Sequence, residues 1–596
     1  MLHKFLLGLS RHVASPVLHA VVRHRRVIGM VSVAGGAIAG NFLFDHAGGQ
    51  AQAEPAAATV TPSKIQVPHD APKYLKSSYF SSLSSPRQSD DNKDDIPNVF
   101  KSQSFENPLG LGGIYQQGGD VNTAGNAFFQ RLGTNGRTCY SCHRPDSGMS
   151  LSLGSIRETF NRTSGRNPLF APVDGADCPN NLPASDTASA LLGGRRGEGR
   201  RDFKSAHSLL LNKGLFRIFL PVPKQTNDLS AVGSPAHPTE FTISVVSDPN
   251  GCNTDPAYTT YVDPVTHEVS QMVSVYRRPR MSSNLPFAMV PTLTMGLGFL
   301  PNIDILTGEY VTDPATGQPI SGNIMWDGRE PTLESQARSA TLVHAQALTP
   351  PTAAQLAQIV EFEKKTFAAQ ARLKNAGDLT GKDGSVVFGG PQALSTQPIA
   401  LGAFAGYDTW KAATDTSMSE KAQKRASIAR GQEIFNFKQF SVSNTTGFND
   451  ARVLITGTNP QAASCATCHS IPAGTSVFPR AQFVIGTGGQ AARLGGPAPS
   501  KDLPIFKLSC KAPYTTPYDG AEVLTNDPGM ALITGRCADI GRKTTPQIRA
   551  MASRAPYFSD GSAATLRDVV EFYNKRYSIN FTEQDKKDLI SFLEAM

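Results

Sequence analysis

The sequence predicts a mainly α-helical fold built from two units of unequal length, and three observations support this. Apolar residues recur at helical intervals in several stretches of the 596-residue chain. A Cys-x-x-Cys-His motif occurs once in each half, at Cys139–His143 and Cys465–His469. A glycine-rich linker at 376–418 divides the chain. We therefore expect one unit at 107–375, with a long loop-rich insertion and a few short strands, and another at 419–596.

The first 106 residues predict an export signal followed by a flexible leader. Residues 1–53 carry five Lys and Arg against one acidic residue, then an apolar stretch and the small-x-small sequence Ala51–Ala53. An uncleaved anchor is the alternative, because the apolar run is near the length that spans a bilayer. Residues 54–106 are rich in Ala, Pro and Ser. We expect a periplasmic protein with no stable membrane insertion after signal removal. Its net charge of +8 does not indicate a nucleic-acid partner.

Four stretches predict helices, and the region 161–276 between the first two predicts irregular structure with a few strands. A short helix is expected at 125–132 and a longer one at 349–373, where Leu356, Ile359, Val360 and Phe367 follow a helical period. Further helices are expected at 419–436 and 582–596. In the last, Thr582 caps the helix and the buried stripe is Leu589, Leu593 and Met596.

Eight cysteines are present, and four of them lie outside the two Cys-x-x-Cys-His motifs. In an oxidising compartment, cysteines that come in local pairs predict disulfides. The simplest pairing is Cys178–Cys252 and Cys510–Cys537. Other connectivities remain open, because sequence alone does not determine them.

The Cys-x-x-Cys-His spacing predicts covalent haem attachment. On one helical turn, two thiols add to the two haem vinyl groups while the next residue presents its imidazole to the iron. A four-cysteine zinc site is the alternative, but it leaves the histidine unexplained in both copies. We therefore expect two c-type haems, held by Cys139, Cys142 and His143 and by Cys465, Cys468 and His469.

The sixth position of each iron is not filled by an obvious residue. Electron carriers usually supply Met or His there. The next histidine after His143 is His207, and after His469 the chain holds no histidine and only Met530, Met551 and Met596.

The chain resembles the di-haem cytochrome c peroxidase superfamily, and more narrowly its MauG-like branch. The shared stretches are GTNGRTCYSCH, VYRRP, MWDGREPTLESQA, SCATCH and RAPYFSDGSAATLRDVVEFYN. The resemblance implies two cytochrome c-like haem domains. It also implies an oxidoreductase that uses hydrogen peroxide or dioxygen and exchanges electrons with a redox partner protein or an organic donor.

The resemblance also assigns roles to residues around the first haem. Trp326 matches the tryptophan that relays electrons between the haems, although a buried core aromatic is the alternative, and Gln336 matches a family glutamine. Gln346 stands where the peroxidases place a distal glutamate, and an amide has no carboxyl proton to exchange. His344 could supply a titratable group instead, or be a hydrogen-bonded structural histidine; both readings stay open.

Three further positions bear on the metal sites. Tyr573 stands where MauG-like proteins have a tyrosine ligand, although it could instead pack against the haem edge. The first haem is then open and the second closed. Arg278 stands where the peroxidases have a calcium-binding asparagine, which argues against the family's calcium ion. A segment at 286–322, long for a loop, precedes Trp326 and is a candidate lid, partner surface or simple insertion.

The expected activity is activation of peroxide or dioxygen at the first haem, with electron transfer through Trp326 to the second. One alternative is a non-enzymatic electron-transfer cytochrome. Another is a haem oxygenase of the rubber-oxygenase type, but those enzymes carry a phenylalanine where this chain has Thr341.

Overall fold

The computed structural model describes residues 96, 98–182, 199–226, 237–262, 267–289, 323–382, 389–397, 402–411, 419–450, 458–476, 482–492, 496–518 and 520–596. All of them belong to one of the two units of the chain, Ser63–Met596. The predicted signal, most of the predicted leader and most of the segment 286–322 lie outside the described residues. Within the described ranges, no helix is both long enough and apolar enough to cross a bilayer.

The prediction of a mainly α-helical fold with two cytochrome c-like domains is wrong. The described residues form helices together with strands in five small sheets. Two of these sheets draw strands from the stretch 161–276, whose short apolar runs pair with one another and with distant segments. The sequence predicted a few strands in this stretch but not how they pair, because each strand is only three to nine residues long.

The strands are β1 (Ser102–Asn107), β2 (Gly110–Gln116), β3 (Phe216–Pro221), β4 (Phe241–Ser247), β5 (Thr260–Val262), β6 (Val269–Arg277), β7 (Thr366–Leu373), β8 (Gly377–Asp378), β9 (Phe440–Val442), β10 (Gln461–Ala463), β11 (Gln482–Phe483), β12 (Ile505–Cys510), β13 (Glu522–Thr525) and β14 (Lys543–Thr544).

The α-helices are α5 (Leu153–Thr163), α7 (Gly199–Ala206), α8 (Ser208–Lys213), α9 (Pro256–Thr259), α10 (Leu285–Ala288), α11 (Leu333–Val343), α12 (Ala353–Lys365), α13 (Pro391–Leu394), α14 (Glu420–Phe437), α15 (Cys465–Cys468), α16 (Ala531–Thr534), α17 (Leu566–Arg576) and α18 (Glu583–Ala595). Single 3-10 turns are η4 (Thr123–Gly125), η5 (Ala127–Phe129), η6 (Cys139–Ser141), η7 (Pro145–Ser147), η8 (Pro168–Phe170), η9 (Pro179–Asn181), η10 (Asp408–Trp410), η12 (Cys537–Asp539) and η13 (Met551–Ser553).

The stretch 349–373, predicted as one helix, is a helix followed by a strand. α12 ends at Lys365, and β7 pairs antiparallel with β2 along its whole length. Phe367, which fitted the helical period, is therefore a strand residue. The sequence TFAAQARL is buried on both faces except at Arg372, so it lacks the alternation that marks a half-exposed strand.

The three-stranded sheet β13-β12-β4 connects the two predicted units. β12 pairs with β13 on one side and with β4 on the other, so residues 241–247 lie beside residues 505–510. The disulfides Cys178–Cys252 and Cys510–Cys537 are both present, which confirms the predicted pairing. The segments 107–375 and 419–596, which the sequence predicts as separate units, thus share a sheet. The boundary between them at 376–418 stays a prediction.

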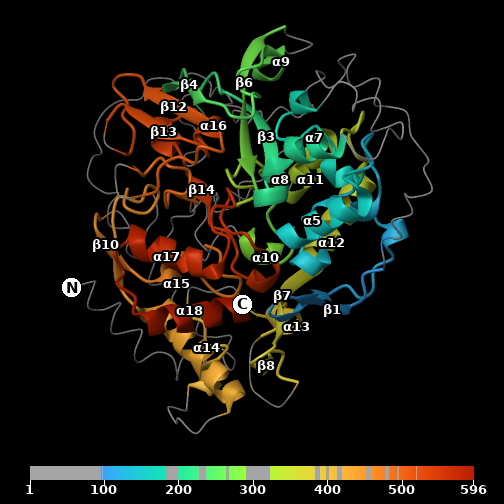
Figure 1. Cartoon of the computed structure of the whole chain (residues 1–596), viewed down its shortest axis with the longest axis vertical. Helices are drawn as coiled ribbons and strands as arrows, with labels where there is room; N and C mark the ends of the chain where they lie inside the picture. Colours follow the sequence, from blue (N-terminus) through green and yellow to red (C-terminus); the bar gives the residue numbers. More distant parts are fainter. Residues whose placement is uncertain are drawn as a thin grey trace, which may run out of the picture. The chain divides into compact units, whose positions relative to one another are not determined.

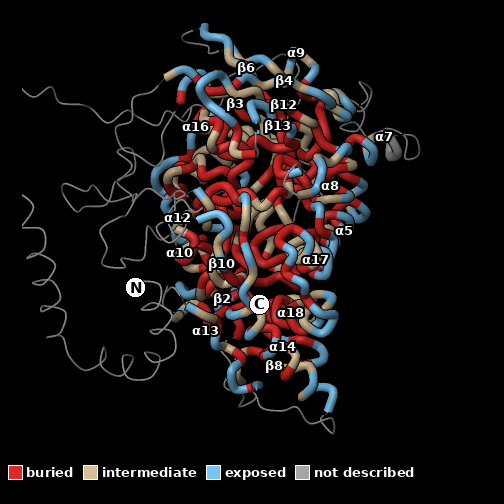
Figure 2. The backbone as a smooth tube through the Cα atoms, turned by 90° about the vertical axis from the view of Figure 1, so that its left-hand side faces the viewer, coloured by how far each residue is buried: buried red, intermediate tan, exposed pale blue. Residues whose placement is uncertain are grey.

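The C-terminal helices form the largest apolar core. α14 and α18 pack along each other and α17 covers α18 (Figure 1). Helices begin where the sequence predicts, because Ser419 and Thr582 cap α14 and α18. Leu589, Phe592 and Leu593 are buried between the helices. Figure 2 shows that buried segments gather in the interior of the described part, with exposed ones around them.

We predict that Gly431→Ala destabilises the protein by about 1–3 kcal/mol. A Cβ at Gly431 would lie 1.9 Å from the Asp588 carbonyl oxygen, so α14 and α18 would have to separate. Gly154→Ala on α5 is the matched control. Its Cβ would meet nothing nearer than 3.8 Å, and helix propensity favours alanine by about 1 kcal/mol. Denaturant unfolding measures both, and equal stabilities would contradict the close helix crossing.

Candidate functional site

The two Cys-x-x-Cys-His motifs fold into the same local structure. Each forms one turn closed by a capping box, Thr138 with Ser141 in η6 and Ser464 with Thr467 in α15. A short antiparallel bridge follows each motif and brings a carbonyl back to the histidine. The Nδ1 atom of His143 lies 3.1 Å from the Met149 carbonyl oxygen, and that of His469 lies 2.6 Å from the Gly474 carbonyl oxygen.

These carbonyls determine which ring nitrogen of each imidazole carries the proton. An Nδ1–H that donates to a carbonyl leaves Nε2 with a free lone pair, which is the form that binds iron. Burial favours the same neutral form: it lowers the pKa of His143 to about 4 and also lowers the pKa of His469. Both imidazoles are thus prepared as neutral Nε2 ligands.

Matching aromatic residues surround the two histidines. The ring centroids of Phe128 and His143 lie 6.4 Å apart at 54°, and those of Phe435 and His469 lie 6.3 Å apart at 56°. Each phenylalanine packs in turn on a second one, Phe128 on Phe362 and Phe435 on Phe592. The chain therefore contains two equivalent sites with the same surroundings on the histidine side.

The structure favours haem over zinc at these motifs. All four motif cysteines lie outside the disulfides. Cys139 and Cys142 pack against two neighbouring apolar cores and Cys465 and Cys468 against a third, and in the described ranges no three Cys, His, Asp or Glu side chains gather around one point. A four-cysteine zinc site is therefore not assembled. Two thiols and a fixed imidazole on one turn, against aromatic walls, fit a covalently attached haem.

A cavity opens beside the second motif. Its lining includes Cys465, Cys468 and His469 together with Tyr573 and Tyr577 from α17. Burial first, and then the neighbouring tyrosine and cysteines, raise the pKa of Tyr573 well above its usual value. The phenol is therefore protonated until a strong positive charge such as ferric iron approaches it. Met551 also lines the cavity, but its sulfur lies 2.9 Å from Nη2 of Arg554.

A second repeated element stands before the helix at each site. The turns Ile324–Glu330 and Tyr557–Ala563 correspond residue for residue, and each is closed by an antiparallel bridge between its ends. Met325 and Phe558 both have φ of 65°, an unusual value for residues with side chains. Asp327 and Asp560 each accept a hydrogen bond from the amide two residues on. The sequences share only Asp-Gly here, so the repeat was not evident beforehand.

The helices after these turns are equivalent as well. Thr332 caps α11 and Thr565 caps α17, and both helices have eleven residues. Ala337 packs in the apolar core that includes Cys139, and its counterpart Val570 packs in the core that includes Cys465. Three residues further on, on the same helix face, the first site has Ala340 where the second has Tyr573. The two sites therefore differ at the position from which Tyr573 reaches its cavity.

The other predicted residues of α11 take ordinary places. Gln336 is half-buried and corresponds to Val569, which lines the second cavity. Thr341 is buried and donates to the Ala337 carbonyl within the helix. His207, the nearest later histidine to the first motif, has both ring nitrogens within hydrogen-bonding distance of carbonyls and is structural.

His344 is held by a buried acid that the sequence did not reveal. Its Nδ1 lies 2.6 Å from Oδ2 of Asp174, whose other oxygen pairs with Arg137. Burial opposes ionisation of Asp174, but Arg137 and His344 outweigh it and lower its pKa. Nη1 of Arg137, two residues before Cys139, also donates to the His344 carbonyl at 3.2 Å, so His344 lies near the first motif. Asp174 lies 170 residues from His344, beyond the reach of any local motif.

Gln346 is fixed by the loop that leads into the first motif. The amide Nδ2 of Asn135 donates to Oε1 of Gln346 at 3.1 Å and to the His344 carbonyl at 2.8 Å. Thr134 donates to the Gln346 carbonyl at 2.9 Å. Because its Oε1 is occupied, the amide NH2 of Gln346 remains as a donor. The structure therefore brings His344 and Gln346 together beside the first motif.

Trp326 lines the wall of the second cavity. Its Nε1 donates to the Arg278 carbonyl at 2.8 Å, and the Arg280 guanidinium lies 5.4 Å from the centre of its ring. The segment 278–281 lines the same cavity, and Met281 also packs in the core that includes Cys139. Trp326 therefore adjoins the second site and the segment that leads to the first.

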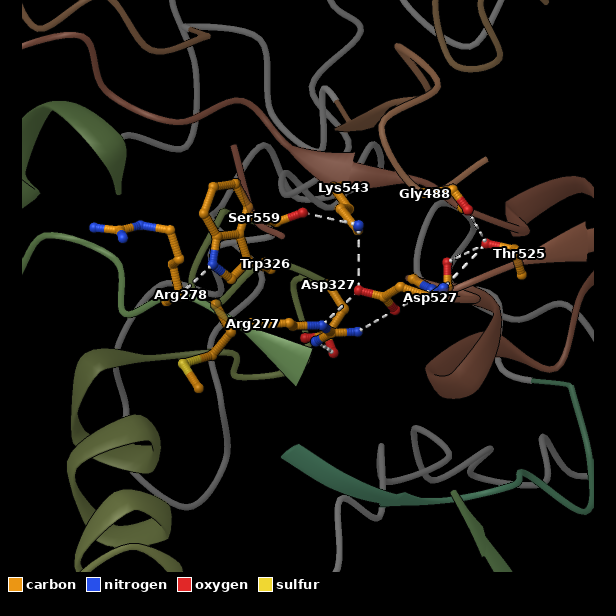
Figure 3. Close-up of polar contacts among 12 residues, drawn as sticks. Arg277, Arg278, Trp326, Asp327, Gly488, Thr525, Asp527, Lys543 and Ser559 are labelled. Carbon is orange, nitrogen blue, oxygen red and sulfur yellow. Dashed lines mark hydrogen bonds and ion pairs between the residues drawn. The ribbon is translucent and has the colours of Figure 1, made fainter. Parts of the chain in front are cut away.

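A buried charge network fixes the Trp326 turn (Figure 3). Arg277 donates to both oxygens of Asp527 at 2.8 Å and also pairs with Asp327. Lys543 lies 3.2 Å from Asp527 and donates to Ser559, the counterpart of Trp326 in the second turn, at 2.9 Å. The network thus ties the two repeated turns to the end of β6.

Arg278, which stands where the resemblance would place a calcium-binding asparagine, brings a cation of its own to that position. Its buried guanidinium donates to the carbonyls of Leu151 at 2.6 Å, Arg554 at 2.9 Å and Lys213 at 3.3 Å. Burial lowers its pKa to about 9, and the neighbouring Arg554 acts in the same direction. A second cation beside this one would be strongly repelled, so these residues do not fit a calcium ion.

Comparisons with known proteins give short, distant similarities. No family model matches the chain. A protein named cytochrome-c peroxidase IdrP1 from Denitromonas iodatirespirans is 36% identical over 92 residues, 14% of this chain and 24% of that protein. The protein of the same name from Pseudomonas sp. (strain SCT) is 31% identical over 81 residues, 12% and 21% of the two chains. Cytochrome-c peroxidase IdrP2 from D. iodatirespirans is 28% identical over 145 residues, 22% and 35%.

A solved structure described as a MauG-like protein associated with microbial copper homeostasis overlaps 44% of this chain and 58% of its own, at 15% identity. Its TM-score of 0.20 is too low to indicate a shared fold. The chain spans about a fifth to a third of the length of the curated relatives it matches. It is thus distantly similar, over those stretches, to cytochrome-c peroxidases.

We predict that Asp327→Asn lowers the free energy of unfolding by about 3–5 kcal/mol, because the substitution breaks a buried ion pair. The pKa values of Asp327 and Asp527 are lowered from 3.8, chiefly by arginine, although burial opposes this. The stability that these two carboxylates contribute is therefore fully present above about pH 4. It is lost as the pH falls through the pKa values that they have in the folded protein. Denaturant unfolding across this range measures both effects.

Lys224→Met, which removes an exposed pair with Glu268, should cost about 0–1 kcal/mol. A similar cost for the two variants would contradict the analysis.

Proposed function

We propose that this chain is a periplasmic di-haem c-type oxidoreductase of the cytochrome c peroxidase and MauG-like kind. In this proposal, hydrogen peroxide or dioxygen reacts at the first site, and electrons pass through Trp326 to the second. One observation supports it above the others: two sites with the same histidine geometry differ at the helix position where one has Ala340 and the other Tyr573.

Each site would hold one haem through the residues of its motif. Cys139 and Cys142 would attach the first haem and Cys465 and Cys468 the second, with His143 and His469 as ligands through Nε2. The haems supply irons that bind an oxidant and exchange single electrons. Tyr573 would close the second iron as an anionic ligand, while a methyl group at Ala340 is too short to close the first.

The polar groups of the first site would handle the protons of the reaction. His344 donates its Nδ1–H to Asp174, so its Nε2 is free to take a proton from peroxide and return it to the departing oxygen. The NH2 group of Gln346 would donate a hydrogen bond to the bound oxidant and orient it. An amide exchanges no proton, so His344 carries that role.

Trp326 would relay electrons between the two sites. The Arg278 carbonyl accepts from its Nε1, and the buried network of Arg277 and Asp327 fixes its turn, so its place in the wall of the second cavity is held from two sides. The electrons would come from a redox partner protein or an organic donor.

The magnetic spectrum of the ferric haem-loaded protein tests this proposal. We expect one high-spin component, which shifts when cyanide or peroxide is added, and one low-spin component that does not respond. Two low-spin haems that ignore both reagents, before and after reduction, would instead indicate a non-enzymatic electron-transfer cytochrome. Turnover of an organic substrate with dioxygen and no peroxide would indicate an oxygenase.

We predict that Ala340→Tyr converts the first site to the closed form. The high-spin component should disappear and cyanide binding should be lost, because the new phenol occupies the position that Tyr573 has at the second site. Tyr573→Phe should do the reverse and create a second high-spin component. Ser339→Phe, which copies Phe572 one residue away, is the control and should leave the first site open. A high-spin signal that survives Ala340→Tyr would contradict the correspondence of the two helices.

A further inference from the structure

Glu363 is a buried acid beside the first site that the proposed reaction does not use. Its side chain is 4% exposed, and its Oε2 has no hydrogen-bond partner among the described residues. It lies on the buried face of α12 with Leu356, Ile359 and Phe362. An unpaired carboxyl in such surroundings carries a large desolvation cost when it ionises.

The internal repeat indicates what Glu363 faces. α12 and α18 are equivalent: each has thirteen residues, follows its site's helix and is capped by a threonine. Phe362 packs on Phe128 as Phe592 packs on Phe435. The next residue is Glu363 in α12 and Leu593 in α18, and Leu593 lines the cavity that holds Cys465 and His469. Glu363 therefore stands at the position of the first site that corresponds to a cavity-lining residue of the second.

The apolar core against which Cys139 packs contains Leu356, Ile359 and Phe362 of α12, so Glu363 lies near the first motif independently of the repeat. After burial, its field is the next largest cause of the raised pKa of Cys139. Burial alone raises the pKa of Glu363 itself to about 8. α11 carries Glu334 and Arg338, and α12 carries Glu361, Lys364 and Lys365, yet none of these contributes to that pKa. η5 and α10 carry no charged residue. Glu363 thus has no compensating cation from these packed elements.

We propose that Glu363 faces the first haem and exchanges a proton with solvent whenever the iron of that haem changes its oxidation state. This inference rests on the proposed function only in requiring a haem at the first site. When the iron loses an electron to an external acceptor, the site gains one positive charge, and the carboxyl releases its proton to solvent as a carboxylate. When the iron is reduced by an external donor, the carboxylate takes one proton back. The net charge of the apolar site therefore stays the same on oxidation and on reduction.

Potentiometric titration of the haem-loaded protein as a function of pH tests this inference. Glu363 holds its proton more tightly when the iron is reduced, so the potential of the first haem should fall as the pH rises. The fall should approach about 59 mV for each tenfold decrease in proton concentration. It should level off once the pH exceeds the pKa that Glu363 has when the iron is reduced. Glu363→Gln and Glu363→Leu, which installs the residue of the second site, should both remove this dependence.

The controls use the same helix and the other site. Glu361→Gln removes an exposed carboxyl two residues away and should leave the pH dependence unchanged. Infrared difference spectra of the oxidised and reduced protein should show the band of a protonated carboxyl that is lost on oxidation and absent in both Glu363 variants.

The outcomes separate this inference from the proposed function. A first haem whose potential is constant with pH, or a dependence that survives in both Glu363 variants, overturns the role of Glu363 and leaves the proposed function untouched. Failure of haem to attach at Cys139 and Cys142 overturns the proposed function, and the inference falls with it.

Discussion

The buried ion pairs between Arg277, Asp327 and Asp527 determine where the Trp326 turn lies. A buried arginine is stable only when its charge is compensated, and here two carboxylates from distant segments compensate it. The next residue, Arg278, binds Trp326 through its carbonyl and the Ser559 carbonyl through its amide at 2.8 Å. Two consecutive residues at the end of β6 thus hold both repeated turns. Rates of electron transfer depend steeply on distance, so this rigidity suits a residue proposed to relay electrons.

The two sites repeat one backbone arrangement and differ in a small set of side chains. The motif turn, the aromatic pair, the Asp-Gly turn and the two helices recur at both, while Ala340, His344 and Glu363 correspond to Tyr573, Tyr577 and Leu593. The first site therefore has a small residue and two titratable groups where the second has two phenols and an apolar side chain. Proton exchange suits the first site, and electron storage in a closed pocket suits the second. Shared geometry with different side chains is how one fold supports two roles.

The sequence predicted the motif residues, the start of α14, the cap of α18 and both disulfides, because these depend on local spacing or on pairing within a segment. It predicted a few strands in 161–276 but not how they pair into sheets, since β4 and β12 are more than 250 residues apart and each is only six or seven residues long. The end of α12 was misplaced because the buried strand β7 continues the apolar pattern of the helix.

Asp174 and Glu363 were missed for related reasons: the first acts across a long sequence separation, and the second stands on an apolar helix face that gives no sign of a nearby haem. The repeat was hidden because its two copies share backbone angles rather than residues, as Met325 and Phe558 do.

The positions of the proton-carrying groups indicate how the first site would meet solvent. His344 keeps 30% of its side chain exposed while its partner Asp174 is fully buried, so the imidazole connects the interior to water. Gln346 lies beside it on the same loop, and Leu348 two residues further is 73% exposed. Tyr573 and Tyr577 lie instead in a cavity where burial raises the pKa of both phenols above the usual value. A small oxidant and the protons it consumes need a path to water, whereas an electron does not. The contrast in exposure therefore agrees with the contrast in side chains, and both support the proposal that the oxidant reacts at the first site.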